Sequence, residues 1–141
     1  MIRVVLDTNV VVSALLHPLG FPARAFLIAL GSVTAQLCVT GEIYAEYEEV
    51  IHRPKFDRRE DVIESILGAI RRNALWVKPS ERVTACSDPD DNIFLEYAWT
   101  ARAQYVVTGN LKHFPVKWAE TQIVTARQFV DAMAEIGENT R

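Results

Sequence analysis

Residues 2–9 of the chain read Ile-Arg-Val-Val-Leu-Asp-Thr-Asn. The segment Ile2–Leu6 is short, β-branched and apolar on both faces, as expected of a buried strand in a parallel sheet. An acid, Asp7, follows it directly, and Asn9–Leu16 then has the composition of a short helix. A buried strand that leads through an acid into a helix predicts an α/β fold with a polar site at the end of the strand.

The same alternation continues along the chain. The further expected strands are Ala35–Val39, Leu75–Val77, Gln104–Val107 and Gln122–Val124, and the further expected helices are Ala23–Leu30, Glu42–His52, Glu60–Arg72, Asp91–Arg102 and a last helix that opens at the capping box of Thr125 and ends near Glu135. We therefore predict a single-domain α/β/α sandwich over residues 1–136, with a central parallel sheet of about four to five strands. Residues 137–141 are expected to be a frayed, disordered tail.

Composition narrows the class of protein. The 141 residues fit one domain, and half of them are hydrophobic, so a real core is available. A net charge of −3 excludes a protein that coats nucleic acid through bulk positive charge. It does not exclude a nuclease, because a local basic patch or a bound metal can still meet phosphates.

Cysteines and apolar runs indicate the compartment. Cys38 lies in an apolar run and is expected to be a core thiol, and neither it nor Cys86 has zinc-type spacing. The first residues do not form a signal peptide, because the apolar run is short and Asp7 interrupts it. No apolar stretch reaches the roughly 18 residues that span a membrane. We therefore expect a soluble, cytoplasmic protein with no membrane contact.

Three acids from distant parts of the chain are the candidate catalytic residues: Asp7, Glu46 and Asp91. Each has an ordinary structural alternative. Asp7 could simply cap the following helix. Glu46 shares its helix with Glu42 and Glu49, and the three could form a solvated acidic face. We favour Glu46 because it lies in mid-helix, where its placement is better fixed.

Asp91 belongs to Asp88-Pro89-Asp90-Asp91-Asn92, which has three acids just before an expected helix. Acids are favourable at a helix N-terminus without any metal, and that explains one or two of them. It explains three less well, because their mutual repulsion grows. Asp91 would point from the first turn toward the strand ends, and Asp88 would cap the helix or support the site.

Polar groups after the expected strand Gln104–Val107 complete the candidate site. Thr108-Gly109-Asn110 is also an ordinary turn sequence. Functionally, Asn110 would offer a neutral oxygen, and the hydroxyls of Thr108 and Thr8 would orient acids or water. Lys112 and Arg53 are the candidates to meet a substrate phosphate, although exposed basic residues mostly serve solubility.

Taken together, these segments resemble a PIN domain, and within that family the toxins of toxin–antitoxin systems that are similar to VapC. The matching stretches are Val4–Val10, Glu46–Phe56, Asp88–Asn92 with its helix, and Val106–Phe114. The resemblance covers nearly the whole chain, and the ordered set is far more specific than any one motif.

The resemblance implies a Mg²⁺- or Mn²⁺-dependent endoribonuclease in which Asp7, Glu46 and Asp91 are the metal ligands. The cation would activate a water molecule that attacks an RNA phosphodiester, and no histidine is needed as a base. The family often has a fourth acid where this chain has Asn110, so a second metal stays open. The implied partners are RNA, a cognate antitoxin and a second copy of the chain in a homodimer.

Two other functions compete with this hypothesis. A phosphatase with Asp7 as nucleophile usually needs a second acid two residues on, and this chain has Asn9 there. A PIN-fold module that binds RNA or protein without cutting would have lost its acids, and only the Asn110 position shows such a loss.

Overall fold

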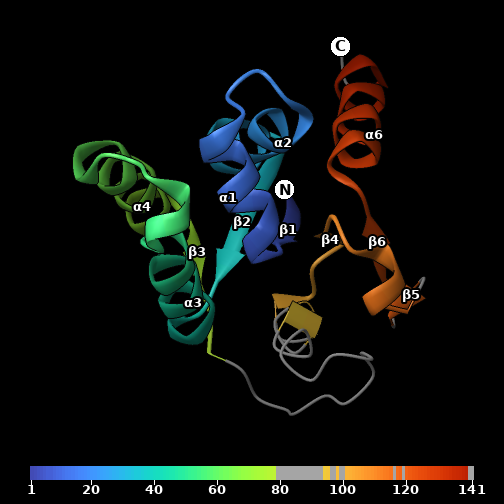
Figure 1. Cartoon of the computed structure of the whole chain (residues 1–141). Coiled ribbons are helices and arrows are strands. Elements are labelled where there is room, and N and C mark those ends of the chain that lie inside the picture. The colour runs from blue at the N-terminus through green and yellow to red at the C-terminus, as the bar shows by residue number, and fades with distance from the viewer. Residues whose placement is uncertain (79–93, 96–97, 99–100, 116, 119, 140–141) are drawn as a thin grey trace.

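A computed structural model describes residues 1–78, 94–95, 98, 101–115, 117–118 and 120–139 of the chain. Within these residues, six strands form one sheet in the order β3-β2-β1-β4-β6-β5 (Figure 1). The strands are β1 (Ile2–Leu6), β2 (Ala35–Val39), β3 (Leu75–Trp76), β4 (Tyr105–Val107), β5 (Lys117–Trp118) and β6 (Thr121–Val124).

The five strands expected from the sequence are all present, and they pair in parallel. β1 lies between β2 and β4, so the segment with which the chain begins becomes a central strand. The sixth strand, β5, was not expected, and it pairs antiparallel with β6 at the edge of the sheet. Its two residues are too few to produce an apolar periodicity.

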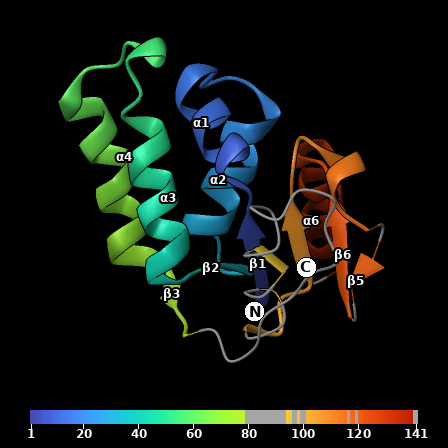
Figure 2. The same ribbon diagram turned by 60° about the horizontal axis from the view of Figure 1, so that its bottom comes forward.

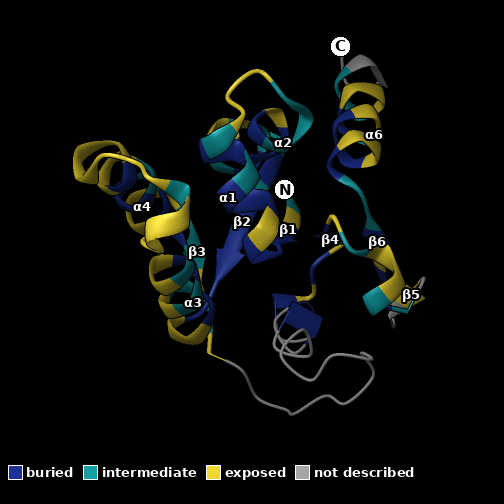
Figure 3. Cartoon of the chain, in the orientation of Figure 1, coloured by how far each residue is buried: buried dark blue, intermediate teal, exposed yellow. Residues whose placement is uncertain are grey.

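The burial of β1 shows that helices cover both faces of the sheet. Val4, Val5 and Leu6 are all completely buried. Successive side chains of a strand point to opposite faces, so burial of all three requires a layer on each side. Figure 3 shows the same concentration of buried residues along the strands and the inner sides of the helices. The predicted α/β/α architecture is confirmed.

The helices of this architecture follow the expected order. They are α1 (Thr8–Leu16), α2 (Phe21–Gly31), α3 (Gly41–Ile51), α4 (Glu60–Asn73) and α6 (Ala126–Asn139), with short 3₁₀ turns η1 (Pro54–Phe56) and η3 (Leu111–His113). α1 contacts α2 and α3, and α2 also contacts α6. Figure 2 shows α3 and α4 side by side as a hairpin at one flank of the sheet, with α6 near the opposite flank.

The last helix is longer than expected. Thr125 and Gln128 form the predicted capping box, because the Thr125 N–H donates to Oε1 of Gln128 and the Gln128 N–H donates to Oγ1 of Thr125. α6 then continues to Asn139, past the expected end at Glu135 and into the expected tail. Gly137 costs a helix only about 1 kcal/mol relative to alanine, which is too little to end it.

The expected helix Asp91–Arg102 lies mostly outside the described residues. Phe94, Leu95, Ala98 and Ala101 are described, and they are helical and buried. The end of this segment is marked by Arg102, whose φ of 52° is left-handed, and by a hydrogen bond of 2.8 Å from the N–H of residue 103 to the carbonyl of Ala98. This combination is a common way to end a helix.

Two smaller expectations can also be compared with the structure. Cys38 is a buried, free thiol, and burial raises its pKa to about 11, so it belongs to the core. Among the described residues, no single helix is long and apolar enough to cross a bilayer.

His52 joins the two helices of the α3–α4 hairpin. Its Nδ1 lies 2.6 Å from the carbonyl oxygen of Glu48, and its Nε2 lies 3.1 Å from Oε1 of Glu60. Both partners are acceptors, and only a protonated imidazole has two N–H donors. The hydrogen bond to the Glu48 carbonyl, followed by the one to Glu60, therefore raises the pKa of His52.

We predict that the His52 contacts stabilise the fold at low pH and lose this effect at high pH. A raised pKa in the folded state gives a stabilisation that is complete below the ordinary histidine value of 6.5 and is lost as the pH rises through the folded value. In urea unfolding, His52→Gln should be less stable than the wild type at about pH 5.5 and nearly equal to it at about pH 8.5. A stability difference that does not change with pH would contradict this.

Candidate active site

Asp7 lies at the end of β1, where α1 begins. Its N–H donates to the carbonyl of Val107 on β4 at 2.9 Å, and its carbonyl accepts from the N–H of Val10 at 2.9 Å. The side chain is only 4% exposed, and it makes no capping hydrogen bond to α1. Its Oδ2 instead accepts from the hydroxyl of Thr108 at 2.7 Å. Asp7 therefore occupies the N-cap position of α1, but its side chain does not cap the helix.

Thr108 holds Asp7 from the neighbouring strand. It is completely buried at the end of β4, and its N–H donates to the carbonyl of Val124 at 2.9 Å. Its hydroxyl donates to Asp7 and accepts from the N–H of Asn110 at 3.0 Å. The hydroxyl hydrogen is thus directed at the carboxylate, because the hydroxyl oxygen already accepts a hydrogen bond from the Asn110 N–H.

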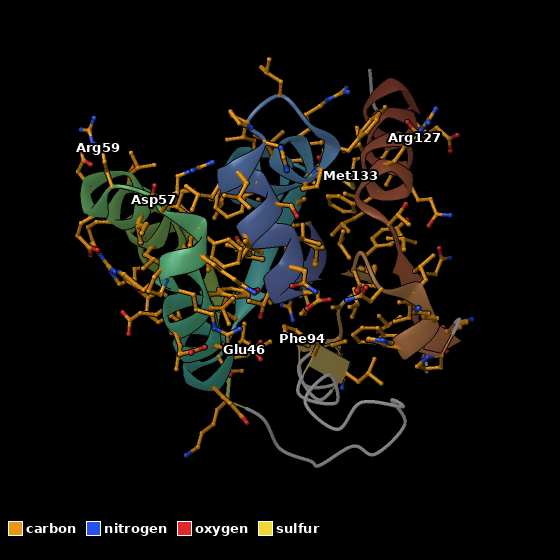
Figure 4. All side chains as sticks on the ribbon, in the orientation of Figure 1. Glu46, Asp57, Arg59, Phe94, Arg127 and Met133 are labelled. Atoms are coloured by element: carbon orange, nitrogen blue, oxygen red, sulfur yellow. The ribbon has the colours of Figure 1, made fainter. Side chains whose placement is uncertain are left out.

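Glu46 comes to the same place from α3. Thr40 begins this helix, and its hydroxyl accepts from the N–H groups of Glu42 at 3.1 Å and Ile43 at 3.4 Å. Glu46 is half-buried, and its Oε2 accepts a hydrogen bond from the hydroxyl of Thr8, the residue after Asp7. Figure 4 shows Glu46 on the side of α3 that faces the middle of the molecule.

The two glutamates of α3 that could form an acidic face with Glu46 are both exposed. Glu42 is exposed in the first turn of the helix, and Glu49 is exposed and pairs with Arg53 at 2.9 Å. The acidic-face explanation therefore suits Glu42 and Glu49, whereas Glu46 contacts the residue next to Asp7.

The remaining predicted residues are placed as follows. Asn110 is half-buried, its backbone N–H bonds to Thr108, and it precedes η3, in which Lys112 is exposed. Arg53 is held by Glu49 at the end of α3. Asp88 and Asp91 lie outside the described residues.

Tyr47 is a residue of this site that the sequence did not suggest. It is completely buried, and its hydroxyl donates to the carbonyl of Leu6, the residue before Asp7. The available signal was the spacing of Ile43, Tyr47 and Ile51, which marks the buried side of α3. That spacing indicates burial but does not reveal what the hydroxyl contacts.

The donor chemistry of the site suits a hard divalent cation. Mg²⁺ and Mn²⁺ prefer carboxylate and other oxygen ligands, and Mg²⁺ needs only a few from the protein. A carboxylate has about four lone-pair positions, and the hydroxyls of Thr108 and Thr8 each take only one of these positions, on Asp7 and on Glu46 respectively. Two acids are gathered here, and the described part of the chain contains no group of three or more possible metal ligands.

We predict that Thr108→Val destabilises the protein by about 1–3 kcal/mol, because valine keeps the shape but leaves the buried Asp7 carboxylate without this donor. Thr108→Ser is the matched control, since it keeps the hydroxyl, and it should lose less. The free energy of unfolding in urea measures both. Equal losses for valine and serine would mean that packing, not the hydroxyl, matters at this position.

Comparison with known proteins agrees with this geometry. The chain is 25% identical over 142 residues to an uncharacterized protein of the archaeon Methanocaldococcus jannaschii, and the alignment covers 92% of this chain and 90% of that protein. Residues 3–112 match the PIN domain family. This match runs from within β1 to within η3, so it contains every described residue of the candidate site. The chain belongs to the PIN domain family.

Proposed function

We propose that this protein is a metal-dependent endoribonuclease that hydrolyses RNA phosphodiester bonds. PIN domains are generally nucleases, so family membership supports hydrolysis of nucleic acid. The observation that carries the proposal is that two carboxylates are held at this end of the sheet. Asp7 accepts from the hydroxyl of Thr108, and Glu46 accepts from the hydroxyl of Thr8, the residue after Asp7. In parallel sheets, this edge beyond the strand ends is where ligands bind.

Asp7 and Glu46 would hold Mg²⁺ or Mn²⁺ together with Asp91, which lies outside the described residues. When bound, the cation would supply an activated water and offset the charge that develops on the phosphate. The charges of Asp7 and Glu46 would repel RNA without it, so activity should depend strictly on the metal.

The hydroxyls of Thr8 and Thr108 would prepare the site before the cation arrives. Each donates a hydrogen bond to one carboxylate oxygen and so restricts the rotation of that side chain. Outer hydrogen bonds of this kind orient metal ligands, and their loss typically weakens metal binding 10- to 100-fold. Their role is therefore to hold the acids, not to touch the substrate.

Asn110 would set the charge of the site. An aspartate at this position would add one negative charge beside Asp7, and the amide does not. We therefore propose one well-held cation, while the charge for a second would need to come from Asp88 or Asp90.

Lys112 and Arg53 would contact the phosphates of the substrate. Lys112 is exposed in η3, two residues after Asn110, so it lies close in sequence to the site. Arg53 would first have to leave its exposed pair with Glu49, and such pairs contribute little stability.

The biological role follows from the resemblance to VapC-like toxins. On that basis we propose a cytoplasmic toxin that is neutralised by a cognate antitoxin and forms a homodimer. A short reading frame beside the gene, whose product binds this protein and blocks cleavage, would support this role independently of the chemistry.

We predict that purified protein cuts a labelled structured RNA with Mg²⁺ or Mn²⁺ and not with EDTA. Asp7→Asn and Glu46→Gln should each lower the rate by about 100-fold or more, because each removes a charge that would hold the cation. Glu48→Gln is the matched control, since it makes the same change on the exposed side of the same helix. It should cut like the wild type.

The contrary outcomes distinguish the alternatives. Cutting that survives EDTA or Asp7→Asn would exclude the metal mechanism. Binding of RNA without cutting would favour a binding module, and release of phosphate from a small monoester would favour a phosphatase.

A further inference from the structure

The peptide bond between Leu6 and Asp7 is held at both of its polar atoms. Its N–H, which belongs to Asp7, donates to the carbonyl of Val107 at 2.9 Å. Its carbonyl, which belongs to Leu6, accepts from the hydroxyl of Tyr47. β4 therefore holds this peptide from one side, and α3 holds it from the other.

Tyr47 also has a special place on α3, because it follows Glu46. Two successive residues of a helix are separated by a fixed rise and rotation, so the position of the Tyr47 backbone determines that of Glu46. The Tyr47 ring is completely buried, and its hydroxyl reaches across 41 positions of sequence to the residue before Asp7. One hydrogen bond thus relates the helix that carries Glu46 to the strand end that carries Asp7.

We propose that Tyr47 is a positioning residue of the metal site: by holding the Leu6 carbonyl, its hydroxyl sets α3 on the end of β1 and fixes the separation of Asp7 from Glu46. The inference rests on the proposed metal-dependent function. It adds a residue that would touch neither metal nor RNA, and it assigns Tyr47 a task beyond filling the core.

The ordinary alternative is a core tyrosine whose hydroxyl has merely found a partner, as most buried tyrosines do. Under that alternative, loss of the hydroxyl would cost stability and nothing more. Under the proposal, loss of the hydroxyl would also change the distance between the two metal ligands, Asp7 and Glu46. Displacement on the order of 1 Å is enough to lower a rate about 100-fold, and loss of outer support weakens metal binding by about 10- to 100-fold.

The test compares Tyr47→Phe with Thr121→Val. The Thr121 hydroxyl also donates to a backbone carbonyl within the core, that of Ala103 at 2.7 Å, and Thr121 lies at the start of β6, away from the site. Each variant thus loses one buried hydroxyl–carbonyl hydrogen bond and keeps its shape. Mn²⁺ binding is measured by electron paramagnetic resonance without RNA, and cleavage kinetics are measured separately.

Tyr47→Phe should bind Mn²⁺ at least about tenfold more weakly and should lower kcat while leaving the KM for RNA nearly unchanged. Thr121→Val should bind Mn²⁺ like the wild type even if its thermal stability falls as much as that of Tyr47→Phe. Equal Mn²⁺ affinity of Tyr47→Phe and the wild type would overturn the positioning role alone. A wild type that neither binds Mn²⁺ nor cuts RNA would overturn the proposed function as well.

A measurement on the wild type keeps the inference testable if Tyr47→Phe does not fold. A hydroxyl held in this way should give a slowly exchanging tyrosine O–H signal in NMR, with a nuclear Overhauser contact to the Hα proton of Asp7, which lies on the same side of the peptide as the Leu6 oxygen. Absence of that contact would contradict the role assigned to Tyr47.

Discussion

The Asp7 carboxylate is buried at the end of a central strand, where a charge is costly unless hydrogen bonds or an opposite charge compensate it. Thr108, the residue after β4, provides a hydroxyl, and the adjoining peptide is bound to Val107, the last residue of that strand. Both contacts require β1 and β4 to lie in register, as they do in the parallel pairing of Leu6 with Val107. Compensation of the Asp7 charge therefore depends on the pairing of β1 with β4.

The second acid depends on α3. Thr40 starts this helix directly after β2, and Tyr47 joins its buried side to β1, so Glu46 lies beside Thr8. The α3–α4 hairpin is held at its surface by His52 with Glu60 and by Arg71 of α4, which donates to the hydroxyl of Tyr44 on α3. These exposed pairs contribute little to stability, and the buried contacts of α3 determine where Glu46 lies.

Much of the fold could be predicted because the strands are short apolar runs and the helices have clear ends. β1 and β2 were predicted with the bounds that the structure has, since each is an apolar run that ends at a polar residue. β5 could not be predicted, because two residues carry no periodicity. The predicted end of α6 near Glu135 was too early. Gly137 is a weak signal for the end of a helix, and the capping box at Thr125 fixes where this helix starts.

The site could be predicted only in part. Residue type and spacing pointed to Asp7, Glu46 and Thr108, but not to the atoms that they contact. The Thr8–Glu46 and Tyr47–Leu6 contacts join residues 38 and 41 positions apart, and such pairs follow from packing and not from local pattern. The spacing of Ile43, Tyr47 and Ile51 marks the buried side of α3, but it does not indicate which atom the Tyr47 hydroxyl contacts.

The central claim is that Asp7 and Glu46 hold one divalent cation between them. Anomalous diffraction from a crystal of the protein grown with Mn²⁺ tests it most directly. We expect one strong peak at about 2.0–2.5 Å from carboxylate oxygens of both residues, as oxygen ligands of hard cations require. A crystal with Mn²⁺ bound elsewhere, or with no peak between these two residues, would contradict the account.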